Sequence, residues 1–406
     1  MVPGCRSCGS GGLETVLAFG PMALADGLLT RETLGRPEPK YPLTLAFCEG
    51  CGLVQILETV PDQTLFGEDY PYYSSYSDTL LEHSRQNAEA LIAGRGLSEE
   101  SLVVELASND GYLLQYFLAR GVPVLGIDPA PGPAAAAEEK GVPTLRAFFD
   151  LELARRLRAR GTRVDVVVAN NVLAHVSDLN GFVAGIGELL RSEGVAVLEV
   201  PYVVDLVDKC EFDTIYHEHH CYFALGPLIS LFSRHGLHVN HVEHHSIHGG
   251  SLRLFVGKRA EASPAVAGLL SREMAEGVNS LERYREFAQR VEAVRRDLRA
   301  MLLGLKAEGK RIAAYGAAAK GATLLGYAGI GTDIIDFVVD RNVHKQGRFM
   351  PGVHVPISDP SRLLEEAPDY VLLLAWNFQR EIIEQQAAYG RAGGRFIVPI
   401  PSPVVI

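Results

Sequence analysis

The stretch from Ser101 to Asp128, "SLVVELASNDGYLLQYFLARGVPVLGID", predicts the fold at the centre of this chain. It contains a short β-branched run, a tight turn, a helical segment and a second apolar run that ends in an acidic residue. Two similar runs follow, "VDVVVANNV" (164–172) and "VAVLEVP" (195–201), with a helical pattern between them. Strands that alternate with helices indicate a parallel sheet with crossover helices. We therefore expect an α/β domain from about residue 81 to residue 257.

Two further zones flank this domain. Residues 1–80 hold two C-x-x-C pairs and few long periodic segments. Residues 272–309 form a long charged stretch that is typical of a solvated amphipathic helix or helix pair. From residue 310 the chain opens a second α/β unit, so the last zone, 258–406, is expected to be Rossmann-like. A chain of 406 residues is too long for one ordinary core, which also favours two or three domains.

The composition narrows the class of protein. Hydrophobic residues make up 47% and charged residues 21% of the chain, as in ordinary globular proteins. The formal net charge of −11 argues against a nucleic-acid partner, because phosphate binding needs a basic face. No apolar stretch is long enough to span a membrane and no signal-peptide pattern is present. We therefore expect a cytoplasmic protein with neither nucleic acid nor membrane as a partner.

Two cysteine pairs, Cys5-x-x-Cys8 and Cys48-x-x-Cys51, predict a structural zinc site. A glycine directly follows each pair, so two tight turns can deliver four thiolates to one tetrahedral ion. Six cysteines are few for a disulfide scaffold of this length, and in a reducing compartment the spacing favours a metal. Redox pairs or ordinary cysteines are the alternative. With four cysteine ligands the zinc would have no open position, and hence no catalytic role.

The turn after the first strand of the α/β domain carries polar side chains where such sheets bind nucleotides. It lacks the G-x-G-x-x-G pattern, so a cofactor without phosphates, such as S-adenosylmethionine, fits better than a dinucleotide. An acidic residue at the end of the second strand can bind ribose hydroxyls, and one of Phe148 and Phe149 can flank the adenine. An ordinary capped turn is the alternative. The expected cofactor-binding residues are Glu105, Ser108, Asn109, Asp110, Asp128, Phe148, Asn170 and Asn171.

The segment "EFDTIYHEHHCYF" (211–223) concentrates titratable side chains. His217 and His219 would share a face on a strand, but two ligands do not make a metal site, and the spacing is not that of helical zinc proteases. A polar hairpin is the bland alternative. Because the segment follows the fourth strand, on the site side of the sheet, we interpret it as an acid/base cluster. His248, just before a Gly-Gly-Ser turn, is the residue of interest in a second histidine cluster.

A second strand–turn–helix pattern, "AAYGAAAKGATLL" (313–325), lies in the C-terminal zone. A helix N-terminus approached by small residues can bind an anion, and Lys320 adds positive charge there. Asp340 and Arg341 end the next strand. A structural Rossmann-like unit without a ligand is the alternative.

The motifs follow one another in an order that spans almost the whole chain: C-x-x-C, C-x-x-C-G, "DYPYYSSYS", "SNDGYLL", "NVLAHV", "EFDTIYHEH", "HGGSLR", "YGAAAKG" and "KQGRFMPG". This order resembles the zinc-containing, S-adenosylmethionine-dependent sugar C-methyltransferases of antibiotic deoxysugar biosynthesis. The resemblance implies a monomer with a zinc-binding domain (1–80), a class I methyltransferase domain (81–257) and a Rossmann-like nucleotide-sugar-binding domain (258–406). Two differences are Ala107, where class I enzymes commonly have glycine, and the polar "HHCYF" beside the active segment.

The resemblance also implies the substrate, a nucleotide-linked, usually dTDP-linked, 4-keto-6-deoxysugar that is methylated through an enolate; we expect methylation at C-3, and C-5 is the alternative. We expect His219 to be the base and Glu218 to orient it or to carry the proton onward. Tyr216 and His175 would hydrogen-bond the C-4 oxygen, and Tyr70 or Tyr72 would reach in from the zinc domain. The expected substrate-binding residues are His248, Tyr315, Lys320, Arg341 and Asn377.

Three other functions are weighed against this one. An O- or N-methyltransferase would use the same cofactor site. A nicotinamide-dependent oxidoreductase needs pyrophosphate-binding glycines that neither turn supplies. A zinc-ribbon nucleic-acid adaptor conflicts with the acidic charge.

Overall fold

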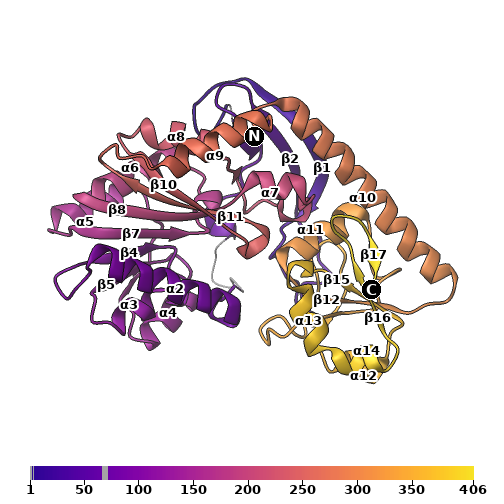
Figure 1. Ribbon diagram of the computed structural model, residues 1–406. Coiled ribbons are helices and arrows are strands. Elements are labelled where there is room, and N and C mark those ends of the chain that lie inside the picture. The colour runs from indigo at the N-terminus through magenta and orange to yellow at the C-terminus, as the bar shows by residue number, and fades with distance from the viewer. Residues whose placement is uncertain (1, 3, 66–71) are drawn as a thin grey trace.

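The computed structural model describes residues 2, 4–65 and 72–406, and its strands form three sheets (Figure 1). The α/β class expected from the sequence is confirmed. Within the described part of the chain, no helix is both long and apolar enough to cross a membrane.

The N-terminal sheet is antiparallel, in the order β1-β2-β3-β9. Its first three strands are β1 (Leu13–Ala23), β2 (Lys40–Cys48) and β3 (Val54–Ile56), and the short helix α1 (Asp62–Leu65) follows. The fourth strand, β9 (Cys221–Tyr222), comes from the histidine-rich segment 211–223. The segment that the sequence marks as an acid/base cluster is therefore bonded to the zinc-binding part of the chain.

The central sheet has the order β10-β11-β8-β7-β4-β5-β6, and β11 is antiparallel to both of its neighbours. Its strands are β4 (Val103–Leu106), β5 (Val124–Ile127), β6 (Thr144–Leu145), β7 (Val164–Asn170), β8 (Leu190–Pro201), β10 (His238–His245) and β11 (Ser251–Gly257). All four residues of β4 are buried, as expected for a central strand of a sheet covered on both faces. The polar residues that follow β4, β5, β7 and β8 therefore meet at one edge of the sheet.

The helices that alternate with the strands of the central sheet along the chain are α2 (Asp78–Arg95), α3 (Leu114–Leu118), α4 (Pro131–Glu139), α5 (Leu151–Ala159), α6 (Leu179–Leu189), α7 (Val203–Asp208) and α8 (Leu225–Ser233). Single 3-10 turns lie at Ser74–Tyr76 (η1), Leu173–His175 (η2), Phe212–Thr214 (η3) and Ile247–Gly249 (η4). Helix α2 begins where the side chain of Ser77 accepts a hydrogen bond from Leu80 N and ends at Gly96, whose φ is 61°.

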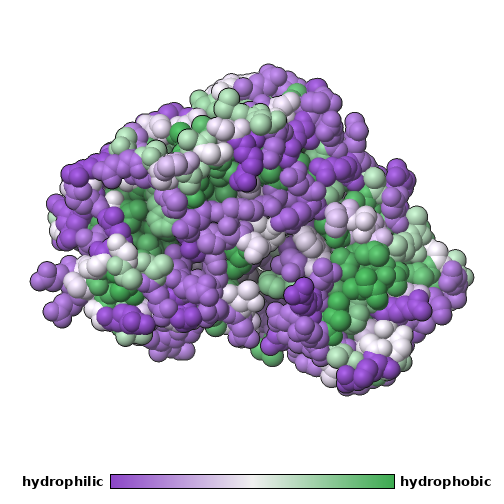
Figure 2. Space-filling view, viewed as in Figure 1, coloured by the Kyte–Doolittle hydropathy of each residue, from purple (hydrophilic) through white to green (hydrophobic). Residues whose placement is uncertain are grey.

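The C-terminal sheet has the order β14-β13-β12-β15-β16-β17 and is parallel except for β17. Its strands are β12 (Ile312–Tyr315), β13 (Val338–Val339), β14 (Ile357–Ser358), β15 (Tyr370–Leu373), β16 (Arg395–Val398) and β17 (Val404–Val405). Its helices are α11 (Ala319–Ala328), α12 (Arg362–Glu366), η5 (Trp376–Phe378), α13 (Gln379–Gln385) and α14 (Ala387–Arg391). Figure 2 shows a largely hydrophilic surface with a hydrophobic area over this C-terminal part.

The charged stretch 272–309 is a helix pair, α9 (Pro264–Ala275) and α10 (Leu281–Ala307), separated near Gly277 with its φ of 66°. Helix α10 contacts both β1 and α11, so it joins the N-terminal sheet to the C-terminal one (Figure 1). Its buried residues follow each other at intervals of three or four positions, which places one apolar face inward.

Candidate active site

The four cysteines come together as the sequence predicts. Their sulfur atoms all lie within 4.8 Å of one another, and the Cys5–Cys51 and Cys8–Cys48 sulfur pairs are each 3.6 Å apart. A tetrahedral ion with Zn–S bonds of about 2.3 Å requires sulfur separations of about 3.8 Å, so the cluster fits zinc. Among the described residues, no other group of three or more His, Cys, Asp or Glu side chains has the spacing for one ion. The histidine-rich segment is thus not a metal site.

The first turn of the central sheet has a backbone conformation that glycine normally adopts. Ala107 lies in the left-handed region with a φ of 56°, at the position where class I enzymes commonly have glycine. Just before it, Glu105 is fully buried, and neither of its carboxyl oxygens has a hydrogen-bond partner among the described residues. Burial raises the pKa of Glu105 well above its ordinary value, and the nearby Tyr112 hydroxyl opposes that shift. A buried carboxyl without a partner fits the amino or ribose groups of S-adenosylmethionine.

Asp128 lies at the end of β5, beside this turn. Its two oxygens accept hydrogen bonds from the backbone N–H groups of Asn109 and Ala130, each at 2.8 Å. Burial raises the pKa of Asp128 to about 6. The carboxyl is thus fixed in place, with further lone pairs that could accept from ribose hydroxyls.

Asn109 and Asp110 make contacts that the sequence does not predict. The Asn109 amide accepts from Ser74 N at 2.8 Å and donates to the Tyr72 carbonyl at 3.2 Å, while Asp110 accepts from Ser75 N at 3.3 Å. These two side chains therefore hold residues 72–75 against the turn that is predicted to bind the cofactor. Direct contact of these side chains with the cofactor stays a prediction.

The remaining predicted cofactor residues line the same edge. Ser108 is buried against Gly126, and its hydroxyl has no partner among the described residues. At the end of β7, the same holds for the buried Asn170 side-chain oxygen. The next residue, Asn171, has a φ of 54° and donates its backbone N–H to Glu199 O.

One of the two adjacent phenylalanines is accessible. Phe149 packs edge-to-face on Phe182 with ring centroids 5.3 Å apart, whereas Phe148 is 39% exposed. Phe148 is therefore the one that can flank an adenine.

His219 has the arrangement of a neutral base. Its Nδ1 donates to the Thr214 carbonyl at 2.7 Å, which leaves Nε2 as the acceptor, and the Tyr216 hydroxyl donates to Nε2 at 3.2 Å. The ring of His175 lies edge-on with its centroid 4.6 Å away. Burial lowers the pKa of His219 to about 4; the bond to Thr214 opposes this shift and the charge of Lys320 adds to it. The imidazole is therefore neutral at ordinary pH.

The residues around His219 have separate environments. The orienting contact that we expected from Glu218 comes from Thr214 instead. Glu218 is buried beside Asp26 of the N-terminal domain; burial raises its pKa well above the ordinary value, and Asp26 acts in the same direction. Burial likewise lowers the pKa of His175 well below its ordinary value, and the neighbouring His219 adds to that shift.

The neighbouring histidine, His217, donates its Nε2–H to the Pro42 carbonyl, 2.9 Å away, and so joins the active segment to the β1–β2 hairpin. Of the two tyrosines expected from the zinc domain, Tyr72 is 43% exposed, and Tyr70 lies outside the described residues.

Three of the five predicted substrate residues, Lys320, Asn377 and His248, are related through Lys320, whose charge also acts on His219. Lys320 Nζ donates to Asn377 Oδ1 at 3.2 Å and lies 4.7 Å from the centroid of the Trp376 ring. His248, with a φ of 55°, is close enough to Lys320 for that charge to add to the effect of burial, which lowers the His248 pKa to about 4.

The other two are placed differently. Tyr315 is buried at the end of β12, and Arg341 is an exposed side chain 3.5 Å from Glu381. A substrate role for these two stays a prediction.

Sequence reasoning missed a buried ionic cluster at the end of β8. Glu199 has no exposed surface and bonds to Arg253 of β11 at 2.9 and 3.1 Å and to His83 of α2 at 2.9 Å. The two charged residues are directly opposite each other in the ladder. A charged residue inside each of the apolar runs "VLEV" and "LRLF" was the available signal.

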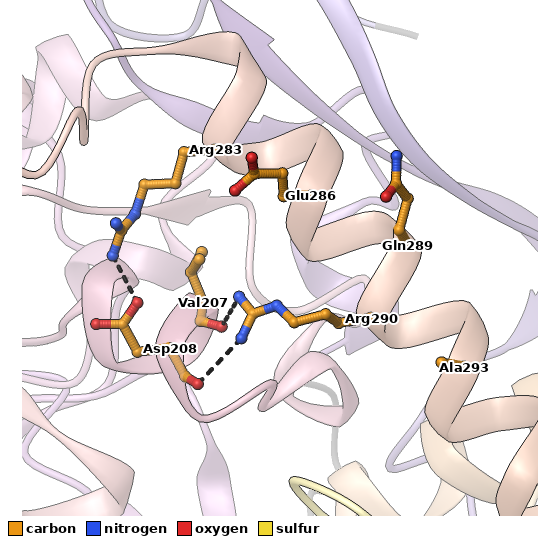
Figure 3. A pocket seen from close by; sticks show the side chains of 7 residues that line it. All are labelled: Val207, Asp208, Arg283, Glu286, Gln289, Arg290 and Ala293. Carbon is orange, nitrogen blue, oxygen red and sulfur yellow. Dashed lines mark hydrogen bonds and ion pairs between the residues drawn. The ribbon is translucent and has the colours of Figure 1, made fainter.

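The surface also has a hollow apart from this site, between α7 and α10 (Figure 3). Its two arginines, Arg283 and Arg290, are bonded to Asp208 and to carbonyls at the end of α7. None of the predicted site residues lines this hollow. Its two arginines instead bind the C-terminal end of α7, where positive charge is favourable.

Comparison with known proteins agrees with this geometry. Three family models match in sequence: a zinc binding domain over residues 5–66, a methyltransferase domain over 80–242 and a C-methyltransferase C-terminal domain over 246–401. The chain is 39% identical to the C-methyltransferase NovU of Streptomyces niveus over 99% of this chain and 96% of that protein.

More distant matches cover less than half of the chain. The Ubiquinone biosynthesis O-methyltransferase of Azorhizobium caulinodans is 30% identical over 30% of this chain and 47% of its own length. A solved magnesium protoporphyrin IX methyltransferase of Synechocystis PCC 6803 shares 16% identity over 44% of this chain and 83% of that one, with a TM-score of 0.36. That structural likeness is too low to carry an argument. The match to NovU does carry one, because it spans both chains almost completely, and the chain therefore belongs to the S-adenosylmethionine-dependent C-methyltransferases, with a zinc-binding domain at its N-terminus.

Proposed function

We propose that this C-methyltransferase acts on a nucleotide-linked, dTDP-type 4-keto-6-deoxysugar and methylates it at C-3, next to the ketone. The observation that carries the proposal is the neutral His219 imidazole, whose Nε2 accepts from the Tyr216 hydroxyl and whose ring contacts that of His175. A heteroatom methyltransferase needs to remove a proton only from a hydroxyl or an amine, whereas an enzyme that methylates the carbon next to a ketone must first remove a proton from that carbon. A neutral base held next to a hydroxyl donor meets that second requirement.

In the proposed reaction His219 Nε2 takes the proton from the carbon next to the ketone. The electrons of the C–H bond form a carbon–carbon double bond, and the ketone oxygen becomes an enolate oxygen. The Tyr216 hydroxyl, which donates to Nε2 in this structure, would turn to the enolate oxygen, and His175 would add a second donor. When bound, S-adenosylmethionine supplies the electrophilic methyl group for which the enolate carbon is the nucleophile.

The low pKa of His219 sets a condition on this chemistry. An imidazole with a pKa of about 4 is a weak base, so proton transfer needs strong stabilisation of the enolate. Negative charge on the enolate beside the new imidazolium would itself favour the protonated ring. Lys320 would favour the enolate through the same field that lowers the His219 pKa.

A mass-spectrometric experiment tests the proposal. The protein would be incubated with S-adenosylmethionine and a set of dTDP-4-keto-6-deoxysugars in deuterated water. We expect one sugar to gain a methyl group, with deuterium entering the carbon next to the ketone in unreacted substrate. NMR of the product would then show which atom carries the methyl group. A methyl group on oxygen or nitrogen would contradict the proposal and indicate an O- or N-methyltransferase.

Two variants of the same segment sharpen the test. His219→Gln should abolish both methylation and deuterium entry, because glutamine accepts no proton. His217→Gln is the matched control, since its amide can keep the bond to Pro42 and His217 touches the β1–β2 hairpin rather than the base. A His219→Gln enzyme with full turnover would exclude His219 as the base. The predicted monomeric state and cytoplasmic location are separate proposals that this experiment does not address.

A further inference from the structure

The N-terminal end of the active segment holds two buried carboxyl groups that the proposed reaction does not use. Glu211 is 3% exposed and Asp213 has no exposed surface. Asp213 accepts one hydrogen bond, from Trp376 Nε1 at 2.7 Å. Among the described residues, Glu211 Oε1 and Asp213 Oδ1 have no hydrogen-bond partner. A buried acceptor without a partner has lost its hydration without compensation, so two of them in one turn need an explanation.

A cation lies close to both carboxyl groups without binding either. The turn η3, which contains Asp213, contacts the helix α11 that carries Lys320. No ion pair within 4.0 Å joins Lys320 to Glu211 or Asp213; its ammonium is instead held by Asn377 and by the face of Trp376. The charge of Lys320 nevertheless acts on both carboxyl groups and on His219. A polar group of a bound ligand would therefore supply the partner that these two carboxyl oxygens lack.

The neighbouring glycine turn closes over the same point. Gly249 has a φ of 96°, and a Cβ atom there would lie 2.2 Å from Glu211 Oε2. Only glycine allows this close approach of backbone to carboxyl. His248, just before it, also lies within range of the Lys320 charge, so the turn adds a fourth polar group from a separate strand connection.

We propose that Glu211 and Asp213, together with Lys320, form a subsite that binds a ring hydroxyl of the sugar and so selects hydroxylated over amino-substituted substrates. A hydroxyl can donate to a carboxyl and accept from an ammonium in the same contact. An ammonium substituent offers donors alone, and it would add a second cation beside Lys320. The charge of Lys320 acts on His219 as well as on both carboxyl groups, so the proposal places one sugar ring near the base and near these acceptors. This inference rests on the proposed function, because it assigns a part of the same substrate.

A cycle of variants and substrate analogues tests the subsite. Initial rates would give kcat/KM for the wild-type enzyme and Glu211→Gln with a hydroxylated dTDP-4-keto-6-deoxysugar, its 2-deoxy and 3-deoxy analogues and its 3-amino analogue. If Glu211 binds one of the hydroxyls, its replacement should lower kcat/KM by about 10–100-fold with the hydroxylated sugar, and by less than about threefold with the analogue that lacks that hydroxyl. Wild type should prefer the hydroxylated sugar over the 3-amino analogue.

Asp205→Asn is the matched control. The Asp205 carboxyl packs against Gly250 of the same turn, yet it is bonded to Lys209 at 2.8 Å and to His244. Its replacement should change kcat/KM by the same factor with every sugar, as a general disturbance of the turn would. Asp213→Asn is the second subsite variant, and its melting temperature separates loss of the Trp376 bond from loss of substrate binding.

The outcomes distinguish the two proposals. The subsite would be overturned if Glu211→Gln and Asp213→Asn lowered kcat/KM equally with every sugar, or if the wild-type enzyme preferred the amino sugar. Methylation by the wild-type enzyme would still uphold the proposed function in both cases. Absence of methylation on all of these sugars by the wild-type enzyme would instead overturn the proposed function, and the subsite with it.

Discussion

Replacing Arg253 by methionine should destabilise the central domain more than any surface charge does. The change leaves the Glu199 carboxylate, whose side chain is 1% exposed, without the guanidinium that lies 2.9 Å away and is itself 8% exposed. Removing one partner of a buried ion pair typically costs about 3–5 kcal/mol, because an uncompensated charge stays behind. For a domain of 150–250 residues each kcal/mol shifts the melting temperature by about 2–4 °C, so a decrease of about 6–20 °C is expected.

The assay is differential scanning calorimetry, with urea unfolding followed by fluorescence as a second probe. The control is Arg191→Met, on the same strand β8, where an exposed pair with Asp165 should contribute no more than about 1 kcal/mol. The double variant Glu199→Leu with Arg253→Met should recover most of the loss, because an apolar pair of similar volume can replace a buried ion pair. A double variant no more stable than Arg253→Met alone would refute the reasoning and assign the loss to packing around His83.

Three further predictions concern the base, the cofactor turn and the zinc. Because burial holds the pKa of His219 at about 4, deuterium entry into the substrate should be level from about pH 6 to 8 and fall only as the pH approaches 4, where the imidazole becomes protonated; an inflection near 6.5 would contradict this. Ala107→Gly should raise the free energy of unfolding in urea by about 0.5–1 kcal/mol. The left-handed backbone costs alanine about 1–2 kcal/mol, which exceeds the additional conformational entropy that glycine loses on folding. A net loss of stability would show that the Cβ atom of Ala107 contributes to packing. Cys48→Ser should lower the zinc content measured by atomic absorption and reduce methyl transfer more than S-adenosylmethionine binding, whereas a zinc-free enzyme with full activity would show that the active segment keeps its place without the metal.

The sequence predicted those features that depend on residues close together in the chain. The zinc cluster follows from two local turns with fixed spacing, and the central strands follow from runs such as "VDVVVAN", whose burial is nearly complete. The proposal of His219 as the base also starts from local sequence, because histidine near a sheet edge is a common choice for proton transfer, and its role stays a prediction.

The contacts between distant segments were not predictable in this way. The sequence around Asn109 does not indicate that its side-chain amide accepts a hydrogen bond from Ser74 N. The pairing of Glu199 with Arg253 depends on the register of two strands that are 54 residues apart. The expected role of Glu218 as the orienting group for His219 was not met, because a backbone carbonyl, which any residue supplies, took that place.

The pairing of β9 with β3 limits how enzymes of this type can be recombined. The edge of the N-terminal sheet is closed by two residues, Cys221 and Tyr222, that lie just past His219, the proposed base. A chimera that exchanged only the first 60 or so residues would thus join a foreign sheet edge to the native segment 211–223, and it would disturb His219 even with every residue of that segment unchanged. A modular exchange of substrate preference has a better chance if the N-terminal sheet and residues 211–223 travel together, as one unit that is discontinuous in sequence.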